Sequence, residues 1–185
     1  MRKNFGAKPY LYPQPVLIIG TYDEDGRPDA MNAAWGGISE ETQISICLSA
    51  GHKTVKNLLK TGAFTVSVAD AKHVVECDYF GIASGNNVPD KLAKAGFHVT
   101  KSGFVNAPLF DELPMALECK VIDYNPDTCI MRGEIVNVNA DESILTDGRI
   151  DPAKLQPISF DPVNNAYLRL GEKVGNAFHD GAALK

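Results

Sequence analysis

Alternating apolar positions in the first half of the chain predict short antiparallel strands. In residues 42–50 (TQISICLSA) and 63–69 (AFTVSVA) every second residue is apolar, as in strands with one buried face. The apolar, β-branched run 15–22 (PVLIIGTY) is followed by DEDGRP, which contains an Asp-Gly turn signal. A second extended stretch, residues 29–37 (DAMNAAWGG), comes next. These features predict a hairpin followed by two further strands.

The second half of the chain contains another hairpin signal. Residues 115–124 and 129–140 are strand-like and flank NPDT, a sequence typical of turns. Gly133 lies inside the second of these segments, where a glycine suggests a β-bulge. We therefore expect a long hairpin with a bulge at Gly133.

Helical spacing is found between the strands. In residues 52–62 (HKTVKNLLKTG), Val55, Leu58 and Leu59 are spaced as on one helix face, and Gly62 stands where a left-handed helix end would fall. The less regular stretch 74–96 predicts two short helices, one ending near Gly81 and one stopping at Gly96.

The chain shows no internal repeat and no alternating βαβ pattern, so a parallel sheet is not expected. A mainly β fold with short helices, closed as a small barrel rather than an open sandwich, would leave few exposed sheet edges. At 185 residues, the chain is interpreted as one domain, 1–185, with a C-terminal tail (about 161–185) that wraps over the body.

Charge argues against several classes of partner. The formal net charge is -5 and no run of Lys or Arg occurs, so nucleic acid and anionic membrane surfaces are poor electrostatic partners. No stretch approaches the roughly 18 apolar residues of a membrane span, and the N-terminus lacks the apolar core of a signal peptide. We expect a cytoplasmic protein without membrane or nucleic-acid partners.

The four cysteines and four histidines do not form a metal-binding pattern. The cysteines lack C-x-x-C spacing and the histidines lack H-E-x-x-H or H-x-x-x-H spacing. Buried, reduced, structural thiols are therefore expected, with no metal site and no disulfide framework.

The junction LSAGHKTVKN joins a strand to the start of the predicted helix. Free backbone N–H groups at a helix start favour an anion, and Lys53 and the nearby hydroxyl groups would suit a terminal phosphate. In the alternative interpretation, Thr54 or Ser49 simply caps the helix and Lys53 is solvated. A nucleoside triphosphate loop is excluded because Cys47 and His52 occupy the positions that require glycine.

The stretch DAMNAAWGG has unusually small side chains for a strand. Asn32, Ala33, Ala34 and Gly36 leave a flat surface, so a planar ligand could approach the backbone closely, with Trp35 stacking on it or forming a wall. Alternatively, the small residues pack under a helix and Trp35 fills the core.

Four longer segments carry a family resemblance: PVLIIGTYDEDGRPDAMNAAWGG, SICLSAGHKTVKNLLKTGAFTVSV, DYFGIASGNNVPDK and YLRLGEKVGNAFHDG. Together they resemble the flavoredoxin branch of the flavin reductase-like, FMN-binding split-barrel proteins. The resemblance implies an antiparallel Greek-key split β-barrel. It also implies a homodimer with one non-covalent FMN per subunit near the dimer interface.

The resemblance also assigns site residues. It places Asn32, Ala33, Ala34 and Trp35 along the isoalloxazine ring, and the other matched positions at the ribityl chain and phosphate: Ser49, His52, Lys53 and Thr54. Lys53 is the best electrostatic candidate. Five further residues are secondary candidates, better explained by packing or, for the first, by a surface amide: Asn57, Tyr79, Phe80, Ser84 and Phe178. No metal ligand and no general acid or base is assigned, because flavin supplies the reactivity itself.

The implied function is an NAD(P)H-dependent FMN oxidoreductase (a flavin reductase) that transfers hydride from nicotinamide to flavin N5. The alternative is a flavoredoxin-type electron-transfer protein that keeps its FMN and receives electrons from a redox protein partner. A third interpretation is a barrel that has lost flavin. The sequence does not distinguish NADH from NADPH, or a tightly bound FMN from an exchanging one.

Overall fold

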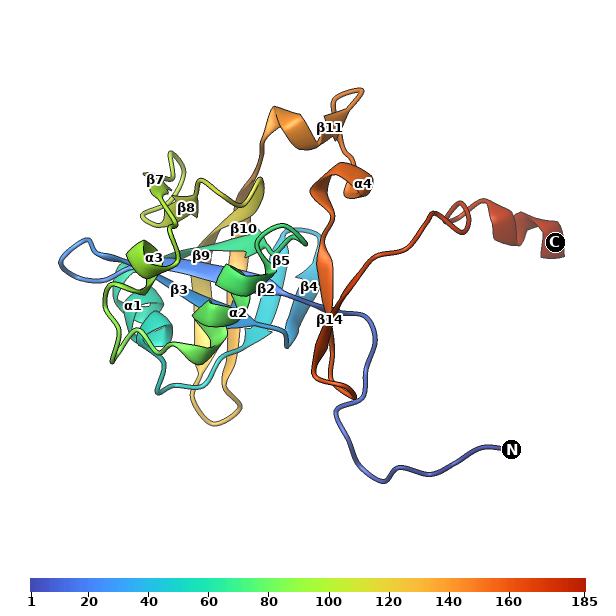
Figure 1. The fold of residues 1–185 in the computed structure, drawn as a ribbon, viewed down its shortest axis with the longest axis horizontal. Coiled ribbons are helices and arrows are strands. Elements are labelled where there is room, and N and C mark those ends of the chain that lie inside the picture. The colour runs from blue at the N-terminus through green and yellow to red at the C-terminus, as the bar shows by residue number, and fades with distance from the viewer.

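A curled antiparallel sheet of seven strands forms the body of the protein in the computed structural model, which describes all 185 residues (Figure 1). The strands lie in the order β3-β2-β6-β9-β10-β5-β4. Their bounds are β2 (Leu17–Tyr22), β3 (Pro28–Ala33), β4 (Gly36–Glu40), β5 (Gln43–Cys47), β6 (Ala63–Val68), β9 (Met115–Asn125) and β10 (Ile130–Ala140). The predicted mainly β, antiparallel split-barrel class is confirmed.

The sequence predicted a single extended strand for the stretch DAMNAAWGG. In the structure, the stretch is divided between two strands. It supplies most of β3, breaks at residues 34–35, and continues as β4 at the opposite end of the sheet. Consecutive strands can occupy the two ends of one sheet only if the sheet curls until its ends approach each other. Gly36 makes this crossing possible, because a Cβ there would lie 3.0 Å from Ile46 Cγ1 and 3.1 Å from the Ser45 carbonyl oxygen on β5.

The long hairpin β9–β10 has its predicted bulge. The pairing register shifts between Arg132 and Gly133. The glycine is needed for packing as well, since a Cβ at position 133 would collide with the ring of Phe64, which is fully buried.

Smaller elements surround the sheet. The helices are α1 (Lys53–Thr61), α2 (Val74–Ile82), α3 (Lys91–Lys94) and α4 (Pro152–Leu155), and the 3-10 turns are η1 (Glu142–Ile144) and η2 (Asp180–Leu184). Two strand pairs are β7 (Val99–Lys101) with β8 (Pro108–Phe110) and β11 (Leu145–Thr146) with β12 (Arg149–Ile150). A separate three-stranded sheet consists of β1 (Gln14–Pro15), β13 (Ile158–Asp161) and β14 (Ala166–Arg169). No helix is both long enough and apolar enough to cross a membrane.

Two apolar clusters form the core. The larger one fills the curl of the sheet and includes Phe64, Met131 and Leu58 of α1. The second is built around an aromatic group in which the ring centroids of Phe80 and Phe97 are 5.0 Å apart. The second cluster attaches α2 and α3 to the barrel, and so fixes the loop between them against the start of α1.

Helix α1 follows its sequence signals closely. Gly62 is left-handed (φ 69°), and its N–H donates to the Leu58 carbonyl at 2.9 Å. Leu59, expected on the apolar face, is instead 52% exposed. Asn57 is not the surface amide we favoured: it is buried, and its Nδ2 donates to Thr21 Oγ1 at 3.1 Å.

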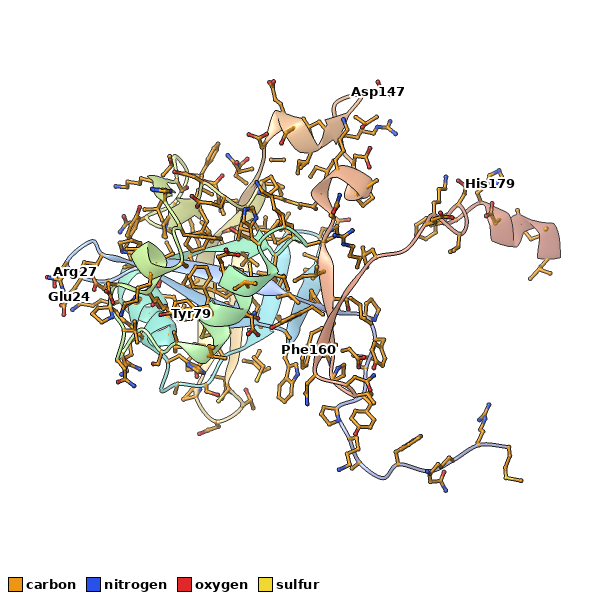
Figure 2. The ribbon with its side chains drawn as sticks, in the orientation of Figure 1. Glu24, Arg27, Tyr79, Asp147, Phe160 and His179 are labelled. Carbon is orange, nitrogen blue, oxygen red and sulfur yellow. The ribbon has the colours of Figure 1, made fainter.

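The C-terminal tail differs from the expectation that it wraps over the body. Residues 161–169 contribute to the three-stranded sheet, but residues 168–185 are all exposed. From residue 170 the chain runs away from the body, and the labelled His179 lies far from the barrel (Figures 1 and 2). The tail makes its hydrogen bonds within itself, including His179 N–H to the Asn176 carbonyl at 3.4 Å.

Candidate functional site

The junction before α1 leaves unpaired donors at the helix start. His52 is the N-cap residue with an extended backbone (φ -69°, ψ 142°), and no side chain caps the helix. The first-turn N–H groups of Lys53, Thr54 and Val55 therefore have no hydrogen-bond partner. The alternative in which Thr54 or Ser49 merely caps the helix is wrong. These N–H groups can instead donate hydrogen bonds to an anion.

A small cavity of about 100 Å³ opens beside these donors. It lies where the start of α1 faces the end of α2 and the loop that follows. The cavity brings together four of the eight predicted site residues: Asn32, His52, Lys53 and Thr54. Two secondary candidates, Phe80 and Ser84, also line it. The remaining lining residues were not predicted: Met31, Gly81, Ile82, Ala83, Gly85 and Lys91.

A buried ionic network lies next to the cavity. Asp29 accepts a hydrogen bond from Thr54 Oγ1 at 2.6 Å, and its other oxygen lies 3.3 Å from Lys91 Nζ. Lys91 also donates to the Ala83 carbonyl at 3.1 Å, and both charged side chains are only 3% exposed. This network ties β3, α1 and the α2–α3 loop together.

Sequence reasoning missed both members of this pair. Asp29 gave one weak signal, a charged residue at the start of an otherwise small and apolar strand. Lys91 gave none, because it lies in PDKLAK, which has the composition of a solvated surface helix.

Lys53, the predicted electrostatic contact, is already paired. Its Nζ lies 3.1 Å from Asp23 Oδ2, and the two side chains are 19% and 13% exposed. Burial acts to raise the pKa of Asp23, but hydrogen bonds from the Arg27 N–H and from Lys53 outweigh it and lower the pKa. The lysine charge is thus balanced within the protein, and the helix start provides the uncompensated donors.

The residues of DAMNAAWGG predicted to contact a ligand do not all face the same cavity. Asn32 faces α2, and its Nδ2 donates to the Cys77 carbonyl at 2.9 Å. Ala33 is buried in the barrel core, so that only its backbone could meet a ligand. Ala34 and Trp35 border a second cavity of about 470 Å³ whose opposite wall is the N-terminal segment 8–15.

Trp35 is 56% exposed, which rules out the interpretation that it fills the core. Ser49 is also exposed, and its carbonyl accepts the His52 N–H at 3.1 Å, which shapes the turn before α1. Among the secondary candidates, Ser84 lines the small cavity, Phe80 belongs to the aromatic core and Phe178 lies in the exposed tail.

Comparison with known proteins agrees with this fold. Residues 10–154 match the family model described as "Flavin reductase like domain". The structure matches the flavoredoxin of Desulfovibrio vulgaris (Miyazaki F) with a TM-score of 0.94 and 40% identity, covering 98% of this chain and 100% of that one. It matches a flavoredoxin from Methanosarcina acetivorans with a TM-score of 0.90 and 24% identity, covering 100% of both chains.

One curated protein, an uncharacterized protein of Aeropyrum pernix, is 27% identical over 115 residues, which are 61% of this chain and 43% of that protein. Since the family model covers well over half of the chain, the protein belongs to the flavin reductase-like family, whose members bind FMN. The family predicted from the sequence is therefore confirmed.

Proposed function

We propose that the protein is an electron-transfer flavoprotein of the flavoredoxin type that keeps FMN bound non-covalently. The observation that carries this proposal is the 40% identity to a flavoredoxin over 98% of the chain, with a TM-score of 0.94. A bound FMN would supply the redox chemistry, the uptake and release of electrons by its isoalloxazine ring. The chain's own residues would bind it, orient it and control its exposure to water.

The small cavity has the size and donors for the phosphate end of FMN. Cofactor pockets usually enclose about 300–1,000 Å³, whereas this cavity encloses about 100 Å³, enough for a phosphate group but not for a whole cofactor. The N–H groups of Lys53, Thr54 and Val55 would donate to the phosphate, with Lys53 and Ser84 beside it. His52 would lie at the mouth.

The rest of the cofactor would then lie along residues 32–35. Strand β3 is an edge strand, so the backbone groups on its outer side have no partner in the sheet. Those groups could pair with the polar edge of a flavin ring, and the 470 Å³ cavity beside Ala34 and Trp35 offers the necessary space. Asn32 would act mainly by holding α2 at the correct distance from β3.

A homodimer is part of this proposal. A cavity bordered by a tryptophan that is 56% exposed is incompletely closed by one chain. A second copy would complete its outer wall. Such closure would protect a reduced flavin from solvent.

NAD(P)H-dependent flavin reduction is the second candidate, and the family description favours it. An absorption spectrum of the purified protein, followed by anaerobic addition of NADH and then NADPH, separates the two. An electron carrier shows bound flavin that stays oxidised with both nucleotides and bleaches with dithionite. Rapid bleaching by either nucleotide would establish the reductase instead, and a protein that takes up no FMN would refute both.

The phosphate assignment has its own test. Thr54→Ala removes the hydroxyl that ties the helix start to Asp29, and should weaken FMN binding by about 1–3 kcal/mol. Lys53→Met should weaken it less, because part of the lysine charge is already engaged by Asp23. Thr61→Ala, at the other end of the same helix, is the control and should leave the FMN dissociation constant unchanged. Equal affinity in the Thr54 variant and the wild type would refute the phosphate site.

A further inference from the structure

The C-terminal arm, residues 170–185, has a defined local structure without support from its own body. The Asn176 N–H donates to Asp180 Oδ2 at 2.7 Å, and His179 Nδ1 lies 3.1 Å from Asp180 Oδ1. This turn continues into η2. A tail that stays in solvent gains nothing from a formed turn. A tail that docks on a surface does gain, because a turn formed beforehand lowers the entropy cost of binding.

The arm displays apolar side chains. Val174 is 102% exposed, Phe178 is 110% exposed and Leu184 is 94% exposed. Exposed apolar groups concentrated on one segment mark a contact surface rather than ordinary surface composition. Figure 2 shows the arm around His179 standing clear of the barrel.

An apolar receiving surface lies near the root of this arm. Strand β14, from which the arm departs, belongs to the same small sheet as β1, which continues the N-terminal segment. That segment and Trp35 border the cavity of about 470 Å³, and Tyr10 and Leu11 at its edge are 43% and 67% exposed. The flavin ring proposed above would occupy the cavity itself, so a docked phenyl ring would cover its exposed apolar edge.

We infer that the arm of one subunit docks on a second copy of the chain and places Phe178 over the open side of the partner's Trp35 cavity. This inference rests on the homodimer proposed above and adds the contact that completes its site. In a two-fold dimer the same patch meets itself, so an axis near β1 and β14 would bring each arm to the other subunit's cavity.

The amount of exposed chain and its charge agree with a second copy as the occupant. The exposed N-terminal residues 1–13 and the 16 residues of the C-terminal arm together number 29, and a standard interface uses about 20–30 residues from each side. The C-terminal arm has two basic and two acidic residues, while residues 14–169 contain 13 basic and 21 acidic ones, a net charge of -8. A neutral arm and an N-terminal segment of charge +3 can cover a body that would otherwise repel its copy.

Trp35 is the only tryptophan, so its fluorescence reports this contact directly. We would follow Trp35 emission and sedimentation of the full-length protein across a dilution series, first without added FMN and then with saturating FMN. The matched variants are Phe178→Ala and Phe104→Ala, the latter removing a phenylalanine that is 61% exposed on the β7–β8 loop. The wild type should dissociate on dilution with a parallel red shift of Trp35 emission.

Phe178→Ala removes two docked phenylalanine side chains per dimer, one from each arm, and should weaken the dimer by at least about 100-fold. It should also show red-shifted emission even where it remains dimeric. Phe104→Ala should behave like the wild type. A dimer of unchanged affinity and emission in Phe178→Ala would overturn the inference. So would Trp35 emission that is independent of dilution, as expected for an arm folding back on its own chain or for a monomer with a different partner. An arm-dependent dimer that binds no FMN would support the inference and refute the proposed cofactor function.

Discussion

The Asp29–Lys91 pair provides a direct test of how the candidate site is held. Replacing Lys91 with methionine keeps most of the side-chain volume but removes the charge that faces the buried carboxylate of Asp29. In the native structure that carboxylate has two polar contacts, Thr54 Oγ1 at 2.6 Å and Lys91 Nζ at 3.3 Å. The variant leaves it with one.

The expected cost follows from burial. Both charged side chains are 3% exposed, so water cannot replace the lost ammonium group. Breaking a buried ion pair by removing one partner typically costs about 3–5 kcal/mol, because an uncompensated charge remains. The Ala83 carbonyl also loses its donor, which places this site toward the upper part of that range.

Urea denaturation followed by circular dichroism measures this cost. The control is Lys94→Met, in the same short helix, since that lysine is 55% exposed, lies 3.1 Å from Asp90, and should change the free energy of unfolding by at most about 1 kcal/mol. The double variant Asp29→Asn/Lys91→Met should recover most of the loss, because it removes both charges. If Lys91→Met costs no more than the control, or the double variant is no more stable than the single one, the reasoning about the buried charge is wrong.

Two further predictions concern close packing and the buried thiols. Gly85→Ala should destabilise the protein by about 1–3 kcal/mol in the same assay, because a Cβ there would collide with the buried carboxylate of Asp29. Gly37→Ala is the control: a Cβ there has open space, so packing should change little. Burial raises the pKa of Cys77 and of Cys119 to about 12, so neither should react with a thiol reagent at pH 8 until the protein unfolds. The other two cysteines are half-buried and should provide all of the rapid labelling; more than two fast thiols would contradict this.

Local patterns in the sequence predicted the local features of the fold. Helix α1 and its end at Gly62 follow from apolar spacing and a left-handed glycine, and the bulge at Gly133 follows from a glycine inside a strand. Each depends on residues close together in the chain. The same is true of the helix start near Lys53, where the structure shows the free donors that the sequence suggested.

Features that depend on distant residues could not be predicted in this way. The break of DAMNAAWGG into two strands results from closure of the whole sheet, which no local pattern records. Burial of Asn57 requires Thr21, 36 positions away, and burial of Lys91 requires Asp29. The family resemblance assigned candidate site residues through its motifs but did not reveal this supporting network.

The pairing of both lysines changes how the candidate site would hold an anion. From the sequence, Lys53 looked like a free cation awaiting a phosphate. In the structure Lys53 and Lys91 each face an aspartate, so the two acids offset their charge and the site approaches neutrality. An anion would therefore be held chiefly by oriented N–H groups at the start of α1, while the ion pairs fix that helix against β3 and the α2–α3 loop. Donors that are preorganised in this way need no rearrangement when the ligand arrives, and for that reason the buried network matters to binding as much as the residues that would touch the phosphate.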